Sequence, residues 1–122
     1  IERHFSQETL EAALASLKEE ARAGDELASK TLATILSRSP TSLKVAWREI
    51  RRGADLSMDD CMRMEFRIVN RMLDGHDFYE GIRAVLVDKG STPVWNPPTL
   101  DGVSDAAAEA YFAPLGDREL VL

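Results

Sequence analysis

Cysteine and histidine are scarce in this chain. Its 122 residues contain one cysteine, Cys61, and two histidines, His4 and His76. A single cysteine excludes a disulfide within the chain and is typical of proteins from a reducing compartment. A structural zinc site needs about four clustered Cys or His ligands, which these widely spaced residues do not supply. We therefore expect neither a metal nor an internal cross-link in this fold.

Positive charge is in deficit, and long apolar runs are absent. The chain has 15 Lys and Arg against 21 Asp and Glu, which gives a net charge of −6. Nucleic acid is not expected as a partner, because neutralising its phosphates needs a surplus of cations. No apolar run approaches the ~20 residues that cross a bilayer, and no secretory signal is visible. The chain begins at Ile1 without an initiator Met, as a fragment would.

The composition that is present is typical of a folded globular protein. Hydrophobic residues make up 44% of the chain and charged residues 30%, which argues against disorder. The length allows one domain at most, or part of a larger one.

Apolar residues recur at spacings of three and four up to Lys89, which predicts five amphipathic helices. We expect each helix to begin at a capping residue, and Pro40 and the pair Ser57 and Asp60 strengthen two of these starts. The expected first residues or caps are Ser6, Asp25, Ser39, Ser57 and Asp77. The expected ends of the first, third, fourth and fifth helices are Gly24, Gly53, Gly75 and Lys89.

Each helix has an apolar stripe that we expect to be buried. The predicted buried residues are Leu10, Ala13, Leu14, Leu17 and Ala21 in the first helix; Leu27, Thr31, Leu32, Ile35 and Leu36 in the second; Leu43, Ala46, Trp47 and Ile50 in the third; and Cys61, Met64, Ile68, Val69, Met72 and Leu73 in the fourth. A helical module of this size could bury these stripes internally or present them to a missing partner, and we expect a partner for at least one face.

The character of the chain changes after Gly90. Pro93, Pro97, Pro98 and Gly102 disfavour regular structure across residues 91–103. A short helix is predicted after Ser104, anchored by Tyr111 and Phe112. We therefore expect an all-α fold of about five helices in a small antiparallel bundle, with a helical domain over residues 1–90 and an irregular tail with a short helix over residues 91–122.

Catalytic residues are hard to find in this pattern. His4 lies in a terminus that we expect to be frayed, which leaves His76 as the available base, and its position between Gly75 and Asp77 favours a turn residue. Glu65 stands among apolar residues of the fourth helix and is either a buried acid or, as carboxylates usually are, exposed or paired with an arginine.

A basic cluster is predicted on the third helix. Lys44, Arg48, Arg51 and Arg52 recur at spacings of three and four, which is typical of a solvated face. The alternative is a site for an anionic ligand such as a nucleotide phosphate, and Arg83 could join it only if its helix packs beside the third.

Three motifs carry a resemblance to a known family. They are Ser-Pro-Thr-Ser-Leu-Lys at residues 39–44, Met-Glu-Phe-Arg at 64–67, and Gly-His-Asp-Phe-Tyr-Glu-Gly-Ile-Arg-Ala-Val-Leu at 75–86, followed by Pro93, Trp95 and Pro97. Together they resemble the carboxy-terminal region of 3-hydroxyisobutyryl-CoA hydrolases, members of the crotonase superfamily. The Asp-Phe-x-Glu-Gly pattern is shared more widely by enoyl-CoA hydratases and isomerases.

The resemblance implies that this chain is the helical part of a larger enzyme. In crotonase-like enzymes an amino-terminal αβ core performs the thioester chemistry with an oxyanion hole of two backbone amides. The carboxy-terminal helices cover the active site and take part in subunit contacts, so the expected partners are that missing core, further subunits of a homo-oligomer and an acyl-CoA. No catalytic residue is carried over to this chain, which we expect to be inactive alone.

The resemblance also implies contacts with CoA. In related hydratases a basic and an aromatic residue after the Glu-Gly pair approach the adenine. Lys89 stands near the basic position, whereas Val85 replaces the aromatic residue. We also expect Arg48 and Arg51 to contact the CoA phosphates. CoA is then part of the substrate, and no metal or redox cofactor is implied.

The resemblance predicts hydrolysis of 3-hydroxyisobutyryl-CoA to the free acid and CoA, a step of valine catabolism. The alternatives are an enoyl-CoA hydratase or isomerase, or a non-catalytic helical interaction module. The expected compartment is the cytoplasm of a bacterium or the mitochondrial matrix of a eukaryote.

Overall fold

A computed structural model describes residues 2–122 and contains helices but no strand in that range. The predicted all-α class is therefore confirmed. The chain forms two compact units, one up to residue 38 and one from residue 39 to residue 122. The predicted division at residue 90 into a helical domain and a tail stays a prediction.

The first unit consists of three helices, α1 (Glu2–Phe5), α2 (Leu10–Arg22) and α3 (Glu26–Leu36). The predicted start of the first long helix at Ser6 is wrong. Ser6 instead closes α1, because its backbone N–H donates to Glu2 O at 2.9 Å. Thr9 caps α2, since its hydroxyl accepts the amide N–H of Ala12 at 3.1 Å.

His4 is an anchor of the first unit, and the expectation of a frayed terminus is wrong. Its side chain is buried, its Nδ1 lies 2.6 Å from Ser16 Oγ, and its Nε2 is paired with Glu20. Both partners lie on α2, so the imidazole holds α1 against that helix. Sequence spacing gave no sign of this contact, because His4 lies outside any apolar repeat.

The turn between α2 and α3 follows the prediction. Gly24 has a φ of 99°, a conformation that favours glycine, and the carboxylate of Asp25 accepts the amide N–H of Ala28 at 2.9 Å. The buried face of α3 was predicted less well. Ala28 is buried, but Leu27 and Leu36 are 59% and 58% exposed.

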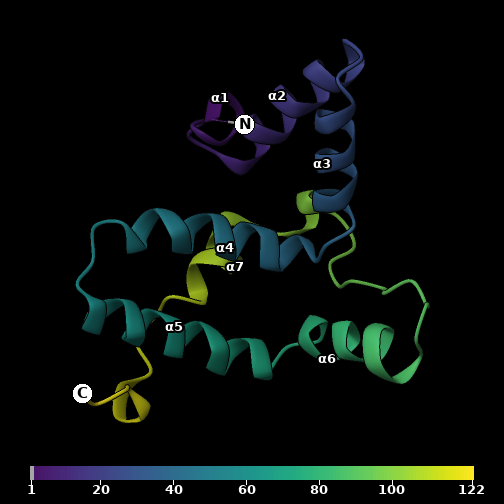
Figure 1. The fold of residues 1–122 in the computed structure, drawn as a ribbon. Coiled ribbons are helices and arrows are strands. Elements are labelled where there is room, and N and C mark those ends of the chain that lie inside the picture. The colour runs from purple at the N-terminus through teal and green to yellow at the C-terminus, as the bar shows by residue number, and fades with distance from the viewer. Residues whose placement is uncertain (1) are drawn as a thin grey trace. The chain divides into compact units, whose positions relative to one another are not determined.

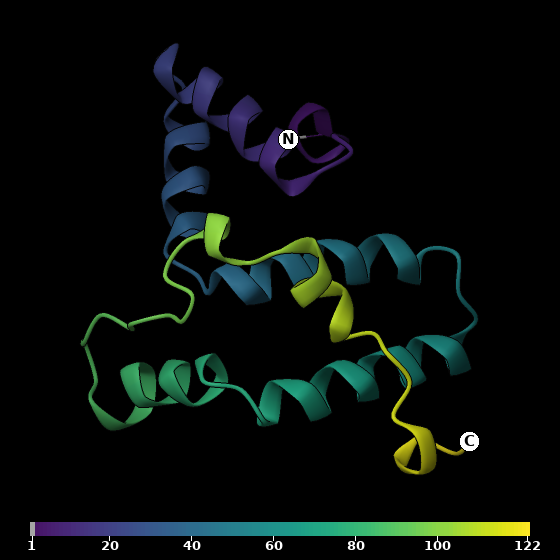
Figure 2. The same ribbon diagram turned by 180° about the vertical axis from the view of Figure 1, so that it is seen from behind.

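The second unit is built on two long antiparallel helices, α4 (Pro40–Gly53) and α5 (Met58–Leu73) (Figures 1 and 2). Both begin as predicted. Ser39 accepts the amide N–H of Ser42 at 3.3 Å, with Pro40 as the first helical residue, and Ser57 accepts that of Asp60 at 3.2 Å.

The remaining elements of the second unit are short. They are α6 (Asp77–Ile82), a π-helical turn at Arg83–Val87, a 3-10 turn at Leu100–Gly102, α7 (Asp105–Ala110) and a 3-10 turn at Gly116–Arg118. The predicted helix after Ser104 is confirmed as α7, since Ser104 accepts the amide N–H of Ala107 at 3.0 Å. In Figure 1, α7 lies across α4.

The core of this unit lies where α4, α5 and the end of α7 meet. Val45, Met64, Ile68 and Phe112 are buried together, with Met72 and Tyr111 packed against them. The expected anchoring role of Tyr111 and Phe112 is therefore confirmed. The predicted buried face of α4 is wrong, because Val45 is 1% exposed whereas Ile50 is 74% exposed and Ala46 is exposed as well.

Two further predictions need correction. On α5, Val69 and Leu73 are 47% and 43% exposed instead of buried. The fifth helix was expected to begin at an Asp77 cap and to reach Lys89, but Asp77 is its first helical residue and the helical turns end at Val87. The amide N–H of Asp88 donates to Arg83 O at 2.7 Å, which closes the π turn.

Candidate functional site

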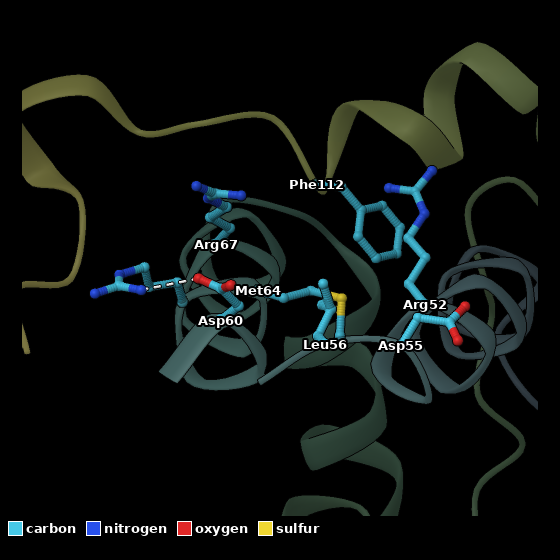
Figure 3. A pocket seen from close by; sticks show the side chains of 8 residues that line it. Arg52, Asp55, Leu56, Asp60, Met64, Arg67 and Phe112 are labelled. Carbon is cyan, nitrogen blue, oxygen red and sulfur yellow. Dashed lines mark hydrogen bonds and ion pairs between the residues drawn. The ribbon is translucent and has the colours of Figure 1, made fainter. Parts of the chain in front are cut away.

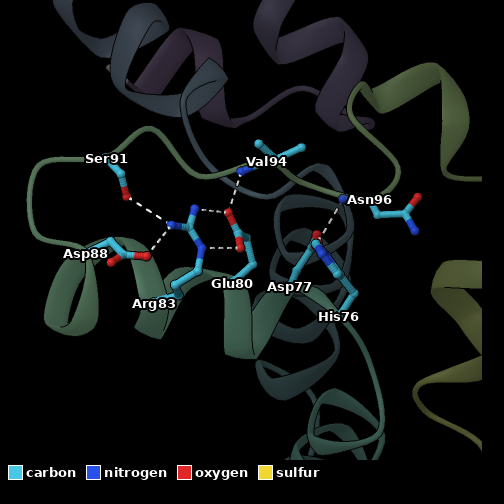
Figure 4. A network of polar contacts seen from close by, with 8 residues as sticks. All are labelled: His76, Asp77, Glu80, Arg83, Asp88, Ser91, Val94 and Asn96. Carbon is cyan, nitrogen blue, oxygen red and sulfur yellow. Dashed lines mark hydrogen bonds and ion pairs between the residues drawn. The ribbon is translucent and has the colours of Figure 1, made fainter.

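The densest polar contacts surround α6 and involve the segment that follows the π turn (Figure 4). Arg83 forms a two-pronged ion pair with Glu80, with Nε–Oε1 and Nη2–Oε2 distances of 2.8 and 2.6 Å. Its Nη1 also reaches Asp88 Oδ2 at 2.9 Å and Ser91 Oγ at 3.3 Å. Such parallel charged hydrogen bonds fix both side chains in one geometry.

Two carboxylates of α6 hold the proline-rich segment by its backbone. Glu80 Oε2 accepts the amide N–H of Val94 at 2.7 Å, and Asp77 Oδ1 accepts that of Asn96 at 2.8 Å. Asp77 Oδ2 also accepts the hydroxyl of Ser39 at 2.5 Å, which ties the start of α4 to α6. These contacts satisfy backbone donors in a segment that has no regular partner.

Glycine at position 81 completes this arrangement. A Cβ built there would lie 3.6 Å from the indole ring of Trp95, an ordinary van der Waals distance, so the ring packs close to this position of α6. The Asp-Phe-x-Glu-Gly pattern and the Pro-x-Trp-x-Pro tail are therefore two halves of one structural unit, which we call the α6 clamp: Asp77, Glu80, Gly81 and Arg83 with residues 91–96.

The electrostatics of the α6 clamp follow from its ion pairs. The guanidinium of Arg83 and the amide of Val94 lower the pKa of Glu80 to about 2. The same contacts with Glu80 and Asp88 raise the pKa of Arg83 further above its ordinary value. Both groups are therefore charged at any physiological pH, as a structural clamp requires and a proton-transfer catalyst does not.

Among residues 2–122, serines lie near both histidines. Ser16 Oγ is 2.6 Å from Nδ1 of His4, an imidazole that is buried in the first unit. The Ser39 hydroxyl donates to Asp77. His76 Nδ1 also contacts Asp77, at 2.8 Å, and its side chain is about half exposed. The aspartate therefore lies between the serine and the histidine, whereas activation of serine needs the histidine in that place. That part of the chain also has no group of His, Cys, Asp or Glu suited to hold a metal ion.

The basic cluster of α4 is largely engaged within the second unit. Arg48 binds Asp105 and Glu109 of α7 at 3.1 and 3.0 Å, and Arg52 is paired with Glu109 as well. Lys44 Nζ donates to the carbonyl of Val103 at 2.8 Å. These contacts attach α7 and its preceding turn to α4, which gives most of the cluster a structural role.

Arg51 and Lys89 are the other cations expected to contact CoA. The guanidinium of Arg51 stacks over the Trp47 ring at 3.6 Å from its centre. Lys89 is exposed just beyond the π turn, next to the exposed side chains of Val85, Leu86 and Val87. Arg83 is held in the α6 clamp and does not join the basic cluster.

A cavity of about 440 Å³ opens between α4, α5 and Phe112 (Figure 3). Leu56, Met64 and Phe112 supply apolar walls, and the Arg52 guanidinium lies 4.3 Å from the centre of the Phe112 ring. The arginines lining the cavity are Arg52, Arg63 and Arg67, which bind Glu109, Asp60 and Glu119 respectively. The cavity therefore has no uncompensated positive charge for an anionic ligand.

Two glutamates, one on α4 and one on α5, form a pair of carboxyl groups that does not line this cavity. Glu49 and Glu65 are hydrogen-bonded to each other, and burial together with Glu65 raises the pKa of Glu49 to about 7. The sequence drew attention to Glu65 as a charge among apolar residues. It gave no sign of Glu49, because the buried face of α4 was placed wrongly.

No helix within residues 2–122 is both long enough and apolar enough to cross a membrane.

Comparison with known families places the whole helical region in one of them. The sequence profile of the enoyl-CoA hydratase/isomerase family matches residues 1–112. The chain is 43% identical over 118 residues to a mitochondrial 3-hydroxyisobutyryl-CoA hydrolase from Gallus gallus, covering 97% of this chain and 30% of the relative. A protein of the same name from Danio rerio is 42% identical over 122 residues, covering 100% of this chain and 31% of the relative.

Two solved structures match the chain over nearly its whole length. A carnitinyl-CoA dehydratase from Mycobacterium thermoresistibile matches with a TM-score of 0.87 and 38% identity, over 98% of this chain and 33% of that one. An enoyl-CoA hydratase from Rhodobacter sphaeroides 2.4.1 matches with a TM-score of 0.85 and 30% identity, over 98% of this chain and 35% of that one. The chain thus spans about a third of the length of the proteins that it resembles.

Proposed function

Since this chain belongs to the enoyl-CoA hydratase/isomerase family, we propose that it is the helical part of an enzyme that hydrolyses 3-hydroxyisobutyryl-CoA to the free acid and CoA. The observation that carries this proposal is the similarity to proteins named 3-hydroxyisobutyryl-CoA hydrolase, which extends over 97% of the chain. The three motifs from Ser39 to Leu86 and the Trp95 segment agree with it. The reaction would be a step of valine catabolism.

We propose that the catalytic groups lie in the part of the parent protein outside this chain. The charged groups of the α6 clamp and most of the basic cluster are engaged in structural contacts. Ser39 and His76 both contact Asp77, and the imidazole beside Ser16 belongs to the buried His4, which holds α1 against α2. The role of the helices is then to cover the thioester site and to contact other subunits. Exposed apolar side chains such as Ile50, Met58 and Val94 support a contact surface.

Contact with CoA is proposed for Lys89, Arg48 and Arg51. Lys89 is an exposed cation close in sequence to the exposed apolar residues Val85, Leu86 and Val87, which suits the adenine ring and the phosphates of CoA. Arg48 would have to share its guanidinium with Asp105 and Glu109, so Lys89 is the stronger candidate of the two.

The second candidate function is hydration or dehydration of an acyl-CoA. It is favoured by the titles of the two similar structures, an enoyl-CoA hydratase and a carnitinyl-CoA dehydratase. A non-catalytic helical interaction module is a further alternative, which the exposed apolar side chains would serve equally well. The curated relatives are named as mitochondrial proteins, so a eukaryotic parent is proposed to work in the mitochondrial matrix and a bacterial one in the cytoplasm.

Assays of the full-length parent and of this chain test these proposals. With 3-hydroxyisobutyryl-CoA, release of free CoA thiol is expected from the full-length protein and not from the chain alone. An unsaturated acyl-CoA serves as the control substrate, with loss of the enoyl absorbance as the signal. Hydration without thiol release would favour the second candidate, and thiol release by the chain alone would overturn the assignment of catalysis to the missing part.

Affinity for CoA tests the proposed contacts. Lys89→Ala in the full-length protein is expected to weaken CoA binding by about three- to tenfold, the usual range for one exposed charge contact. Arg48→Ala and Arg51→Ala are expected to have smaller effects, and Arg22→Ala is the matched control in the first unit. Unchanged affinity in all three variants would remove CoA contact from this chain.

A further inference from the structure

The cavity between α4, α5 and Phe112 has the size of a small-molecule site. Its volume of about 440 Å³ falls within the ~300–1,000 Å³ of pockets that hold such ligands. Leu56, Met64 and Phe112 form an apolar surface in it, and the last two are 5% and 7% exposed because they also belong to the core. This surface suits a ligand that carries a small apolar group.

Asp55 is the charged lining residue that has no counter-ion in the described part of the chain. It lies just beyond the end of α4, and its carboxylate takes part in no hydrogen bond or ion pair among residues 2–122. The nearby guanidinium of Arg52 binds Glu109 instead. Both oxygens of Asp55 are therefore open acceptors, and a cationic nitrogen is the donor that a carboxylate binds most strongly.

Two arginines of α5 keep N–H donors that their ion pairs do not use. Arg63 donates to Asp60 from Nη1 at 2.9 Å, and Arg67 donates to Glu119 from Nε at 2.7 Å. Among residues 2–122 these are the only side-chain hydrogen bonds of the two guanidinium groups, so the remaining donors are open. The two residues are one turn apart and lie on the same side of α5, where both line the cavity. A carboxylate is the acceptor that matches such donors.

The charges of the cavity decide between kinds of ligand. A simple anion would compete with Asp60 and Glu119 for the arginines and would face the negative charge of Asp55. A simple cation binds Asp55 but leaves the open donors of the arginines unused. A zwitterion supplies a partner to both and adds no net charge to the cavity. In the view of Figure 3, the apolar side chains of Leu56 and Met64 lie between Asp60 and Asp55.

We propose that this cavity binds a zwitterionic α-amino acid with an apolar side chain. Its ammonium group donates to Asp55, its carboxylate accepts from Arg63 and Arg67, and its side chain packs on the apolar surface of the cavity. An amino acid is the smallest ligand that joins these three groups at one carbon atom. The proposal concerns a ligand other than an acyl-CoA, so it does not depend on which reaction the parent protein catalyses.

Three ligands with the same branched apolar group test this proposal. Leucine carries both charges, 3-methylbutylamine carries only the ammonium group, and 4-methylpentanoate carries only the carboxylate. The probe is the methyl group of Met64, labelled with ¹³C in the full-length parent and identified by the loss of its NMR signal in Met64→Leu. Leucine should shift this signal with a Kd on the order of 1 mM, as expected of so small a ligand. Each analogue should bind about three- to tenfold more weakly.

Two variants assign the charged contacts separately. Asp55→Asn should weaken the binding of leucine and of 3-methylbutylamine by about three- to tenfold without weakening that of 4-methylpentanoate. Arg63→Gln should weaken the binding of leucine and of 4-methylpentanoate by a similar factor without weakening that of 3-methylbutylamine. Asp59→Asn, at an exposed position that does not line the cavity, is the matched control and should leave all three affinities unchanged. Circular dichroism establishes that each variant folds.

The outcomes bear on separate parts of the proposal. A Met64 signal that stays unchanged at leucine concentrations well above the expected Kd would overturn the site. Binding of either analogue as tight as that of leucine would overturn the zwitterion, because one charge would then contribute nothing. Undiminished binding of leucine in both Asp55→Asn and Arg63→Gln would overturn the assigned contacts.

Discussion

Single side chains in this protein mostly hold backbone in place. Glu80 and Asp77 accept amide protons from Val94 and Asn96, and His4 secures α1 through Ser16 and Glu20. These contacts join residues far apart in the sequence or outside an apolar repeat. Capping residues such as Asp25, Ser39 and Ser57 could be predicted because their partners lie three residues away. Contacts between residues that are distant in the sequence could not be predicted, because no local spacing pattern indicates them.

Glu80→Gln is expected to loosen the proline-rich segment. The change removes the charge that binds Arg83 and weakens the acceptor for the Val94 amide. Hydrogen exchange at the Val94 amide should become several-fold faster at pH 6. Asp88→Asn, which removes an exposed contact with the same arginine, is the matched control and should change this amide less.

The pH dependence of the same contact has a definite sign. The pKa of Glu80 falls from 4.5 to about 2 on folding, so its stabilising effect is complete above pH 4.5 and is lost as the pH falls towards 2. In the wild-type chain the protection of the Val94 amide should therefore persist at pH 4 relative to pH 6. Loss of that protection already at pH 4, while circular dichroism remains unchanged, would contradict this assignment.

Two glycines should respond differently to alanine. A Cβ at Gly102 would lie 2.7 Å from the Pro97 ring, whereas one at Gly81 would lie 3.6 Å from the Trp95 ring. Gly102→Ala should destabilise the chain by about 1–3 kcal/mol through overpacking. Gly81→Ala lies within a helix and should be neutral or slightly stabilising, by up to about 1 kcal/mol. Urea midpoints of both variants would check this, and equal loss of stability would contradict it.

At the scale of elements, the existence of the helices could be read from the sequence but their buried faces could not. The limits of α4 and the starts of α4 and α5 agree with the prediction. The choice of Ala46 and Ile50 over Val45 as the buried side of α4 was wrong, because apolar residues occupy two adjoining sides of this helix. Periodicity detects that a helix is amphipathic, but it cannot say which of two apolar sides meets α5 and Phe112.

Alanine substitutions on α4 would distinguish its two sides. Val45→Ala removes two carbon atoms from the core formed with Met64, Ile68 and Phe112, and should lower the free energy of unfolding by about 2 kcal/mol. Ile50→Ala, at an exposed position, should change it by less than about 0.5 kcal/mol in this chain. A larger effect at Ile50 than at Val45 in urea denaturation would contradict the core described above.

At the scale of the whole molecule, the candidate site lies largely beyond what this sequence could predict. The family and the fold class followed from motifs and from periodicity. The basic cluster was recognised, but its engagement with Asp105 and Glu109 was not, because α7 lies more than 50 residues further along the chain. The Glu49–Glu65 pair likewise depends on how two helices pack.

Replacing exposed apolar residues should separate the stability of this chain from that of its parent. Ile50→Gln with Val69→Gln should change the free energy of unfolding of the isolated chain by less than about 1 kcal/mol, since both positions are exposed. In the full-length protein the same pair should lower the melting temperature by several degrees. Glu26→Gln with Asp101→Asn provides a polar control, and equal effects in both contexts would speak against a covered surface.

The α6 clamp has a consequence for how proteins of this kind are recognised. Its residues, from Asp77 to Gly81 together with Trp95, determine how α6 holds the proline-rich segment that follows it. They contact no reacting atom in this chain. A sequence motif made of these residues therefore identifies a structural feature. Two enzymes that catalyse different reactions can match that motif equally well. Naming the reaction of such a protein therefore requires residues that the clamp does not contain.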